Sequence, residues 1–330
     1  MSHCFVTRPL SQYSGGQGNV GDNTLHLLSV GLKTPRRNFP ETQMFEPYIW
    51  PLAHGRSLEL GPSAQIMGVL NVTPDSFSDG GRYAQADAAL AQARRMAEEG
   101  ASIVDVGGES TRPGGEAVSS AEEQARILPV IEALAGSGEV LISVDTYREE
   151  TARLAIRAGA HIVNDVWGLQ REPGIARVAA ETGAGLVVMH TGRERTKLAD
   201  PIADQVAFLS RSLEIAREAG VDERHILLDP GFGFAKETPE DNLDLMARFS
   251  ELASLGRPLL VGTSRKRFVG AVTGREPHER GAGTATTSVI LRLQGAVIFR
   301  VHDVAINKDA LRFADAMVAR GMKASRKAAD

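Results

Sequence analysis

The sequence predicts an α/β fold: one (β/α)8 barrel, or TIM barrel, with a short N-terminal hairpin as a cap and a disordered N-terminal tail. Two observations indicate this. Short runs rich in Val, Ile and Leu alternate eight times with amphipathic stretches, and polar residues follow most of the runs. Continuous apolar runs are typical of parallel strands buried on both faces. A doubly wound open sheet is the alternative, but it seldom needs eight strand–helix units.

The N-terminal part differs from the rest. Residues 1–47 hold Gly, Ser, Asn and Pro without periodicity, so we predict an irregular extension there and a barrel domain over residues 48–330. Tyr48–Leu52 and Arg56–Leu60 flank Ala53-His54-Gly55 and predict a hairpin that covers one end of the barrel.

Eight strands are predicted in the barrel. They are Ile66–Val72, Ser102–Val106, Leu141–Asp145, His161–Asn164, Gly185–Met189, His225–Asp229, Pro258–Gly262 and Val297–Val301. Helix start signals lie between them. Ser119 with Glu122, and Thr146 with Glu149, have the spacing of capping boxes, and Thr238 precedes a proline that suits the first helical position.

The composition argues against several classes of protein. A net charge of −4 offers no basic surface for nucleic acid, so we expect no such partner. We find no apolar run of about 18 residues and no apolar core of a secretory signal, so we expect no membrane contact and a cytoplasmic location. The single cysteine, Cys4, cannot form an internal disulfide, which fits a reducing compartment.

Polar side chains gather at the predicted carboxyl ends of the strands, where barrels of this kind form their active sites. Acids and amides end the first, third, fourth and sixth strands, and cations follow or end the seventh and eighth. These residues are Asn71, Asp145, Asn164, Asp229, Lys266, Arg300 and His302. A lone Asp at a strand end is often only the cap of the next helix. So many polar residues at one end favour a binding site.

The residue types indicate a divided ligand. Asp145, Asn164 and Asp229 offer the acceptors and donors that suit a flat nitrogen-rich ring. Arginines and a histidine at the other strands attract an anion such as phosphate. The chain has no GxxxxGK[ST] motif, so no P-loop is expected, and no HExxH or paired cysteines, which argues against zinc. Mg²⁺ fits better, because it binds through few protein ligands and phosphate oxygens.

Two long motifs and several short ones resemble those of dihydropteroate synthases. Residues 71–81 read NVTPDSFSDGG and residues 108–114 read GESTRPG, like the two long signatures of that family. Shorter matches follow in the family's order: SVDT at 143–146, ND at 164–165, DPGFGF at 229–234, SRK at 264–266 and RVHD at 300–303. The resemblance covers about Trp50 to Gly321.

The resemblance implies a reaction. The family joins 4-aminobenzoate to 6-hydroxymethyl-7,8-dihydropterin pyrophosphate in folate biosynthesis, by an SN1-like path with Mg²⁺. It also implies a homodimer, for which the helix expected at about Gly283–Leu293 and the last helix are candidates. The first rival is a methyltetrahydrofolate-dependent methyltransferase, which shares the barrel and the pterin pocket. The second is a non-catalytic paralogue that binds pterin, but both long motifs are intact here.

The resemblance also implies roles for individual residues. The pterin would be held by Asp145, Asn164, Asp229 and Lys266. The pyrophosphate would be held by Asn71, Arg112, Arg300 and His302, with the metal on Asn71. The aminobenzoate pocket would be formed by Thr111, Arg112, Pro113, Phe234, Ser264 and Lys266. The catalytic residues would be Asp145, Lys266, Arg300 and His302.

Two positions depart from the family pattern. After the fifth strand the family often has Met-His-Met-Gln-Gly, whereas residues 189–193 here read MHTGR. The loop that follows this strand is expected to be one residue shorter and more basic than in the family. Ala235 stands where some members have glycine. A methyl group there is expected to be tolerated unless the backbone adopts a positive φ.

Overall fold

The structure, a computed structural model, describes residues 45–72, 82–109 and 118–329. In this part of the chain, eight parallel strands close into a barrel in the order β10-β3-β4-β5-β6-β7-β8-β9. They are β3 (Gln65–Asn71), β4 (Ile103–Gly107), β5 (Leu141–Asp145), β6 (Ile162–Asp165), β7 (Gly185–Met189), β8 (Ile226–Asp229), β9 (Leu259–Val261) and β10 (Ala296–Val301). The predicted barrel is confirmed, and each predicted strand end lies within one residue of the observed end.

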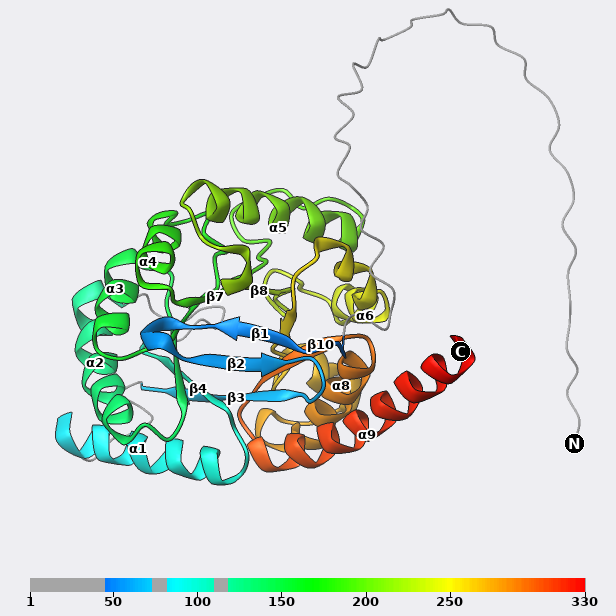
Figure 1. Ribbon diagram of the computed structural model, residues 1–330, viewed down its shortest axis with the longest axis horizontal. Helices are drawn as coiled ribbons and strands as arrows, with labels where there is room; N and C mark the ends of the chain where they lie inside the picture. Colours follow the sequence, from blue (N-terminus) through cyan, green and yellow to red (C-terminus); the bar gives the residue numbers. More distant parts are fainter. Residues whose placement is uncertain (1–44, 73–81, 110–117, 330) are drawn as a thin grey trace, which may run out of the picture. The chain divides into compact units, whose positions relative to one another are not determined.

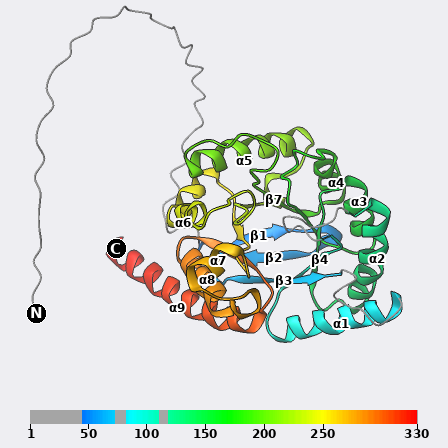
Figure 2. The same ribbon diagram turned by 180° about the vertical axis from the view of Figure 1, so that it is seen from behind.

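Helices surround the barrel, as Figures 1 and 2 show from opposite sides. They are α1 (Arg82–Glu98), α2 (Ser120–Ser137), α3 (Glu149–Arg157), α4 (Gly174–Thr182), α5 (Pro201–Glu218), α6 (Pro239–Ala247), α7 (Arg267–Thr273), α8 (Gly281–Leu293) and α9 (Val304–Ala329). Their apolar faces pack on the strands and bury most of the core. Within the described ranges, no helix combines the length and apolar character needed to cross a membrane.

Two of the three helix start signals act as predicted. Ser119 accepts a hydrogen bond from the backbone N–H of Glu122, and Thr238 forms a complete capping box with Asp241. The prediction that Thr146 caps a helix was wrong. α3 begins at Glu149 with Arg148 as its N-cap, while the Thr146 hydroxyl accepts from the N–H of Arg148 at 3.2 Å. Arg148 is held there by ion pairs with two glutamates, which delays the helix start.

A hairpin of β1 (Tyr48–Pro51) and β2 (Ser57–Leu60) lies across the amino end of the barrel (Figure 1). Trp50 is fully buried, and its indole N–H donates to the carbonyl of His225 at 2.8 Å. Trp50, Leu52 and Leu60 pack on apolar side chains that fill the barrel at this end. The predicted cap is therefore confirmed, and it leaves the carboxyl end for ligands.

Candidate active site

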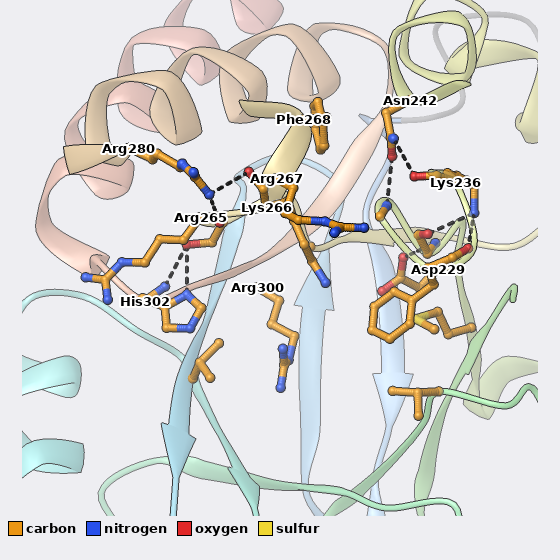
Figure 3. A pocket seen from close by; sticks show the side chains of 18 of the residues that line it. Asp229, Lys236, Asn242, Arg265, Lys266, Arg267, Phe268, Arg280, Arg300 and His302 are labelled. Atoms are coloured by element: carbon orange, nitrogen blue, oxygen red, sulfur yellow. Dashed lines mark hydrogen bonds between the residues drawn. The ribbon is translucent and has the colours of Figure 1, made fainter. Parts of the chain in front are cut away.

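A cavity of about 860 Å³ opens at the carboxyl ends of the strands. Every described residue of the predicted site lines it: Asn71, Asp145, Asn164, Asp229, Phe234, Ser264, Lys266, Arg300 and His302. Lys266 and Arg300 point into the same space, between His302 and Asp229 (Figure 3). Thr111, Arg112 and Pro113 lie outside the described residues.

Arg300 links the cavity to two buried carboxylates. It lies on β10, and its Nη2 donates to Oδ2 of Asp145 at 2.7 Å, while its Nε donates to Oδ2 of Asp105 at 2.6 Å. Burial raises the pKa of Asp145 to about 7; Arg300 opposes this rise and Asp105 adds to it. Burial lowers the pKa of the Arg300 guanidinium, but the carboxylates of Asp105 and Asp145 outweigh this effect. The pKa of Arg300 is therefore raised above its usual value.

Asp229 and Lys266 form a second charged pair of groups. Burial raises the pKa of Asp229 to about 6, although the Gly231 N–H, which donates to its Oδ1 at 2.7 Å, favours the ionised form. Burial and the nearby Arg300 lower the pKa of Lys266 to about 8. The Lys266 ammonium lies 4.1 Å from the ring centroid of Phe234, within the range of a cation–π contact.

His302 and Asn71 are the other described candidates for binding the diphosphate. Ser264 Oγ contacts Nδ1 of His302 at 3.0 Å and accepts from the His302 N–H at 3.1 Å. Ser264 is therefore engaged with His302 rather than with Phe234. Asn71 lies near Asp145, because a Cβ atom placed on Gly107 would be 3.9 Å from Asn71 Oδ1 and 3.8 Å from Asp145 Oδ2.

Sequence reasoning missed Asp105 as a site residue. It lies inside β4, with no exposed surface, and its Oδ2 also accepts from Asn164 Nδ2 at 3.1 Å. The available signal was its place within a run of apolar residues. A carboxylate in a strand buried on both faces is costly unless it is paired, and so predicts partners.

A second missed group supports the loop after β8. Lys236 is buried and donates to the carbonyl of Gly231 at 2.8 Å and to Nδ1 of His190 at 3.2 Å. Nε2 of His190 in turn lies 2.9 Å from Oδ2 of Asp204 and 2.8 Å from Nη2 of Arg195. Burial lowers the pKa of His190 to about 4, which suits the neutral ring that this arrangement needs. His190, directly after β7, thus supports the loop that carries Phe234 through Lys236.

Arg193 is the basic residue that sets the loop after β7 apart from the family pattern. It lines the cavity, and its guanidinium carbon lies 4.8 Å from the ring centroid of Phe234 and 5.8 Å from that of Trp167. Phe234, Val166 and Met189 form an apolar cluster beside it. This wall suits the face of a flat ring.

Ala235 meets the exception stated for it. Its φ is +52°, in the left-handed region that glycine adopts without strain. The stated condition for an unfavourable methyl group is therefore met, because the backbone at Ala235 has the conformation that disfavours a Cβ atom.

The charge of the cavity favours an anionic ligand. Seven lysine and arginine side chains line its described part, against three carboxylates: Arg193, Lys236, Arg265, Lys266, Arg267, Arg280 and Arg300 against Asp145, Asp229 and Glu237. Such a site can hold a polar ring on the carboxylates and the amide, and stabilise charge that develops on a leaving group. Among the residues described, no three His, Cys, Asp or Glu side chains gather where they could hold a metal ion.

Comparisons with known proteins agree with this geometry. Residues 67–302 match the family model of pterin binding enzymes. A dihydropteroate synthase of Bacillus subtilis is 49% identical over 256 residues, which are 78% of this chain and 89% of that protein.

Solved structures are also similar. A Xanthomonas albilineans dihydropteroate synthase with 4-aminobenzoic acid is 43% identical, with a TM-score of 0.76 over 81% of this chain and 97% of that one. The enzyme of the same organism in complex with 7,8-dihydropteroate is 41% identical, with a TM-score of 0.73 over 81% and 98%.

Proposed function

Because the chain belongs to the dihydropteroate synthase family of pterin-binding enzymes, we propose that it condenses 6-hydroxymethyl-7,8-dihydropterin pyrophosphate with 4-aminobenzoate. The products are 7,8-dihydropteroate and pyrophosphate, and the step belongs to folate biosynthesis. One observation carries the proposal: Asp145, Asn164 and Asp229 share one cavity with Lys266 and Arg300. The cavity therefore offers ring-binding and anion-binding groups to a single ligand.

The pterin half uses buried hydrogen-bonding groups. Asp145, Asn164, Asp229 and Lys266 hold the ring through its N–H, NH2 and C=O groups. Asp145 has a second role when the C–O bond to the diphosphate breaks first, because its negative charge then stabilises the cation left on the pterin methylene. Asp229 mainly orients the ring.

The diphosphate half uses the cations. Arg300 and His302, with Arg112 from outside the described residues, bind the pyrophosphate and stabilise the charge that grows on it as it leaves. The amine of 4-aminobenzoate then attacks the methylene carbon, forms the C–N bond and loses a proton. A neutral aromatic amine is already a nucleophile, so this step needs no strong base.

The aminobenzoate pocket combines residues of three loops at the carboxyl end of the barrel. Phe234 and Lys266 form one side of it, and Ser264 contributes from beside His302. Thr111, Arg112 and Pro113 would supply the other side.

Mg²⁺ is the proposed cofactor. The donor set fits it: Asn71 Oδ1 faces the space that Gly107 leaves open next to Asp145, and Oδ1 of Asp145 has no partner among the described residues. Mg²⁺ prefers oxygen donors and keeps several waters, so one amide oxygen plus phosphate oxygens suffices. When bound, it would neutralise negative charge on the diphosphate.

The decisive experiment measures pyrophosphate release from the pterin substrate with Mg²⁺, with and without 4-aminobenzoate. We expect 4-aminobenzoate to be incorporated into 7,8-dihydropteroate in step with pyrophosphate release. Release without incorporation would indicate a hydrolase. A protein that binds the pterin but releases nothing would be a non-catalytic paralogue.

We also propose that the enzyme is a cytoplasmic homodimer. The single cysteine suits a reducing compartment. Five large apolar side chains are exposed on the described parts of the adjoining helices α8 and α9: Ile290, Leu293, Ile306, Phe313 and Met317, with Phe313 70% exposed. Such a patch marks a protein interface. Light scattering should give twice the 35.3 kDa mass of one chain, and a Phe313→Glu, Met317→Glu double variant should be monomeric. A variant that remains dimeric would exclude this surface.

A further inference from the structure

Asp105 lies beneath the floor of the cavity and is absent from its described lining. In the register of the barrel it stands between Val69 on β3 and Ser143 on β5. A buried carboxylate loses its hydration and is retained at little cost only where charged or polar partners replace the water. The question is which partners Asp105 has and what they do.

Both observed partners of Asp105 belong to the proposed site. Its Oδ2 accepts from Arg300 Nε at 2.6 Å and from Asn164 Nδ2 at 3.1 Å. Arg300 is assigned to the diphosphate and Asn164 to the pterin. One carboxylate oxygen therefore joins the two halves of the site from below.

The contact also decides how Arg300 faces the cavity. A guanidinium is planar and has five N–H donors in a rigid fork. Asp105 holds the Nε–H and Asp145 holds one Nη2–H, so the plane of the fork is fixed by two buried carboxylates. The Nη1 group and the remaining Nη2–H are then available for an anion above the floor.

Arg300 is shared between the two carboxylates rather than paired with Asp145 alone. Without Asp105, the guanidinium would be free to rotate about its contact with Asp145. The direction of its remaining N–H donors would then no longer be set.

We infer that Asp105 is a positioning residue, which acts through Arg300 and Asn164 to align the diphosphate-binding fork with the pterin-binding amide. The inference rests on the proposed function, because it concerns the same substrate. It assigns to Asp105 no contact with the substrate itself.

Asp105→Asn tests the inference, since it removes the charge and keeps the shape. We expect kcat/KM for the pterin pyrophosphate to fall by about 10- to 100-fold, the range for a lost hydrogen bond to a charged group. KM for 4-aminobenzoate should stay within about twofold of the wild-type value. Ser143→Ala is the matched control, because Ser143 is the buried register neighbour of Asp105 and does not line the described cavity. It should behave like the wild-type protein.

A double-mutant cycle separates positioning from a merely structural role. In an Arg300→Met background, Asp105→Asn should cause a clearly smaller loss of kcat/KM, because only its contact with Asn164 is left to lose. Binding of inorganic pyrophosphate with Mg²⁺, measured by calorimetry, should weaken in Asp105→Asn alone. Should Asp105→Asn be recovered unfolded, Asp105→Ser, which leaves room for a water, should show the same loss.

The outcomes are distinct. A wild-type protein that forms no dihydropteroate refutes the proposed function. An active wild type with an unchanged Asp105→Asn variant refutes only the positioning role. Equal losses from Asp105→Asn in the wild-type and Arg300→Met backgrounds would also refute it, since Asp105 would then act independently of Arg300.

Discussion

The two ends of the barrel are built from the same eight strands but hold opposite kinds of side chain. At the amino end, Trp50 and its neighbours on the hairpin pack on apolar residues, and Gly185 leaves the space that Trp50 and Leu52 occupy. At the carboxyl end, the buried carboxylates of Asp105 and Asp145 both pair with Arg300, which is 19% exposed. The apolar end supplies stability, and this allows the other end to hold desolvated charges that contribute little to folding.

Arg300→Ala should have the largest effect, because Arg300 belongs to both the chemistry and the packing of the charged end. Losing one preorganised group from a charged site lowers kcat by about 10²–10³-fold. The change also leaves Asp105 and Asp145 without their cation, which costs about 3–5 kcal/mol of folding free energy.

Lys266→Ala isolates the chemistry, since no ion pair of Lys266 supports the described fold. The same loss in kcat is expected, with a melting temperature near that of the wild type. Arg248→Ala is the matched control, because Arg248 lies outside the described cavity lining and pairs only with exposed carboxylates. Normal turnover by Lys266→Ala would show that the active site lies elsewhere.

Trp50→Ala tests the apolar end. Removing a fully buried Trp costs about 3–5 kcal/mol in free energy of unfolding, whereas KM and kcat of the folded fraction should change little. Urea unfolding and steady-state kinetics on the same preparation measure both. Ile49→Ala is the control, because the Ile49 side chain on the same strand is 58% exposed. This change should alter the free energy of unfolding by less than about 0.5 kcal/mol. A large rise in KM for Trp50→Ala would show that the two ends are coupled.

The pH dependence of activity tests the charged end of the barrel, because Asp145 and Lys266 at this end have strongly shifted pKa values. Asp145, with its pKa raised to about 7, must be ionised to stabilise a cation, and Lys266, with its pKa lowered to about 8, must be protonated to donate. We expect kcat/KM to be highest between pH 7 and 8 and to fall on either side. Asp145→Asn should lower activity and remove the acid limb, and a flat profile in the wild type would contradict these roles.

The free energy of unfolding should also depend on pH, because two buried carboxyl groups have raised pKa values in the folded protein. The folded pKa values of Asp145 and Asp229 lie above the value of about 4 for an exposed Asp. Between about pH 4 and 7 the folded chain therefore holds protons on these two groups that the unfolded chain has released, so their contribution to stability falls as the pH rises through this window. The lowered pKa of His190 contributes with the opposite sign, so the test compares urea unfolding of the wild type with that of Asp229→Asn across this range. The stability difference between the two should change with pH in the stated direction, and a difference that is independent of pH would contradict the assignment.

The sequence predicted the fold and nine of the 26 residues that line the described cavity, because both follow from local patterns. Apolar runs marked the strands, and polar residues at their ends marked the site. Asp105 was not assigned, because its partners Asn164 and Arg300 are 59 and 195 residues away along the chain. The buttress of Lys236 and His190 was missed for the same reason. The strain at Ala235 could not be predicted, because it depends on the φ angle of that residue, which the sequence does not give.

Ala235→Gly should have the smallest effect on the free energy of unfolding, and it should stabilise the protein rather than destabilise it. A left-handed conformation costs a residue with a Cβ atom about 1–2 kcal/mol, while glycine adds about 0.4–1 kcal/mol of entropy to the unfolded chain. The net expectation is a gain of about 0.5 kcal/mol in free energy of unfolding. Ala219→Gly is the control, because Ala219 ends α5 at a φ of −79°, where glycine brings no relief. Ala235 stays in place through its carbonyl, which accepts from Lys197 at 2.6 Å, so glycine should relax the loop without moving Phe234. If Ala235→Gly destabilises the protein as much as Ala219→Gly does, the strain is absent and the loop is held by its contacts alone.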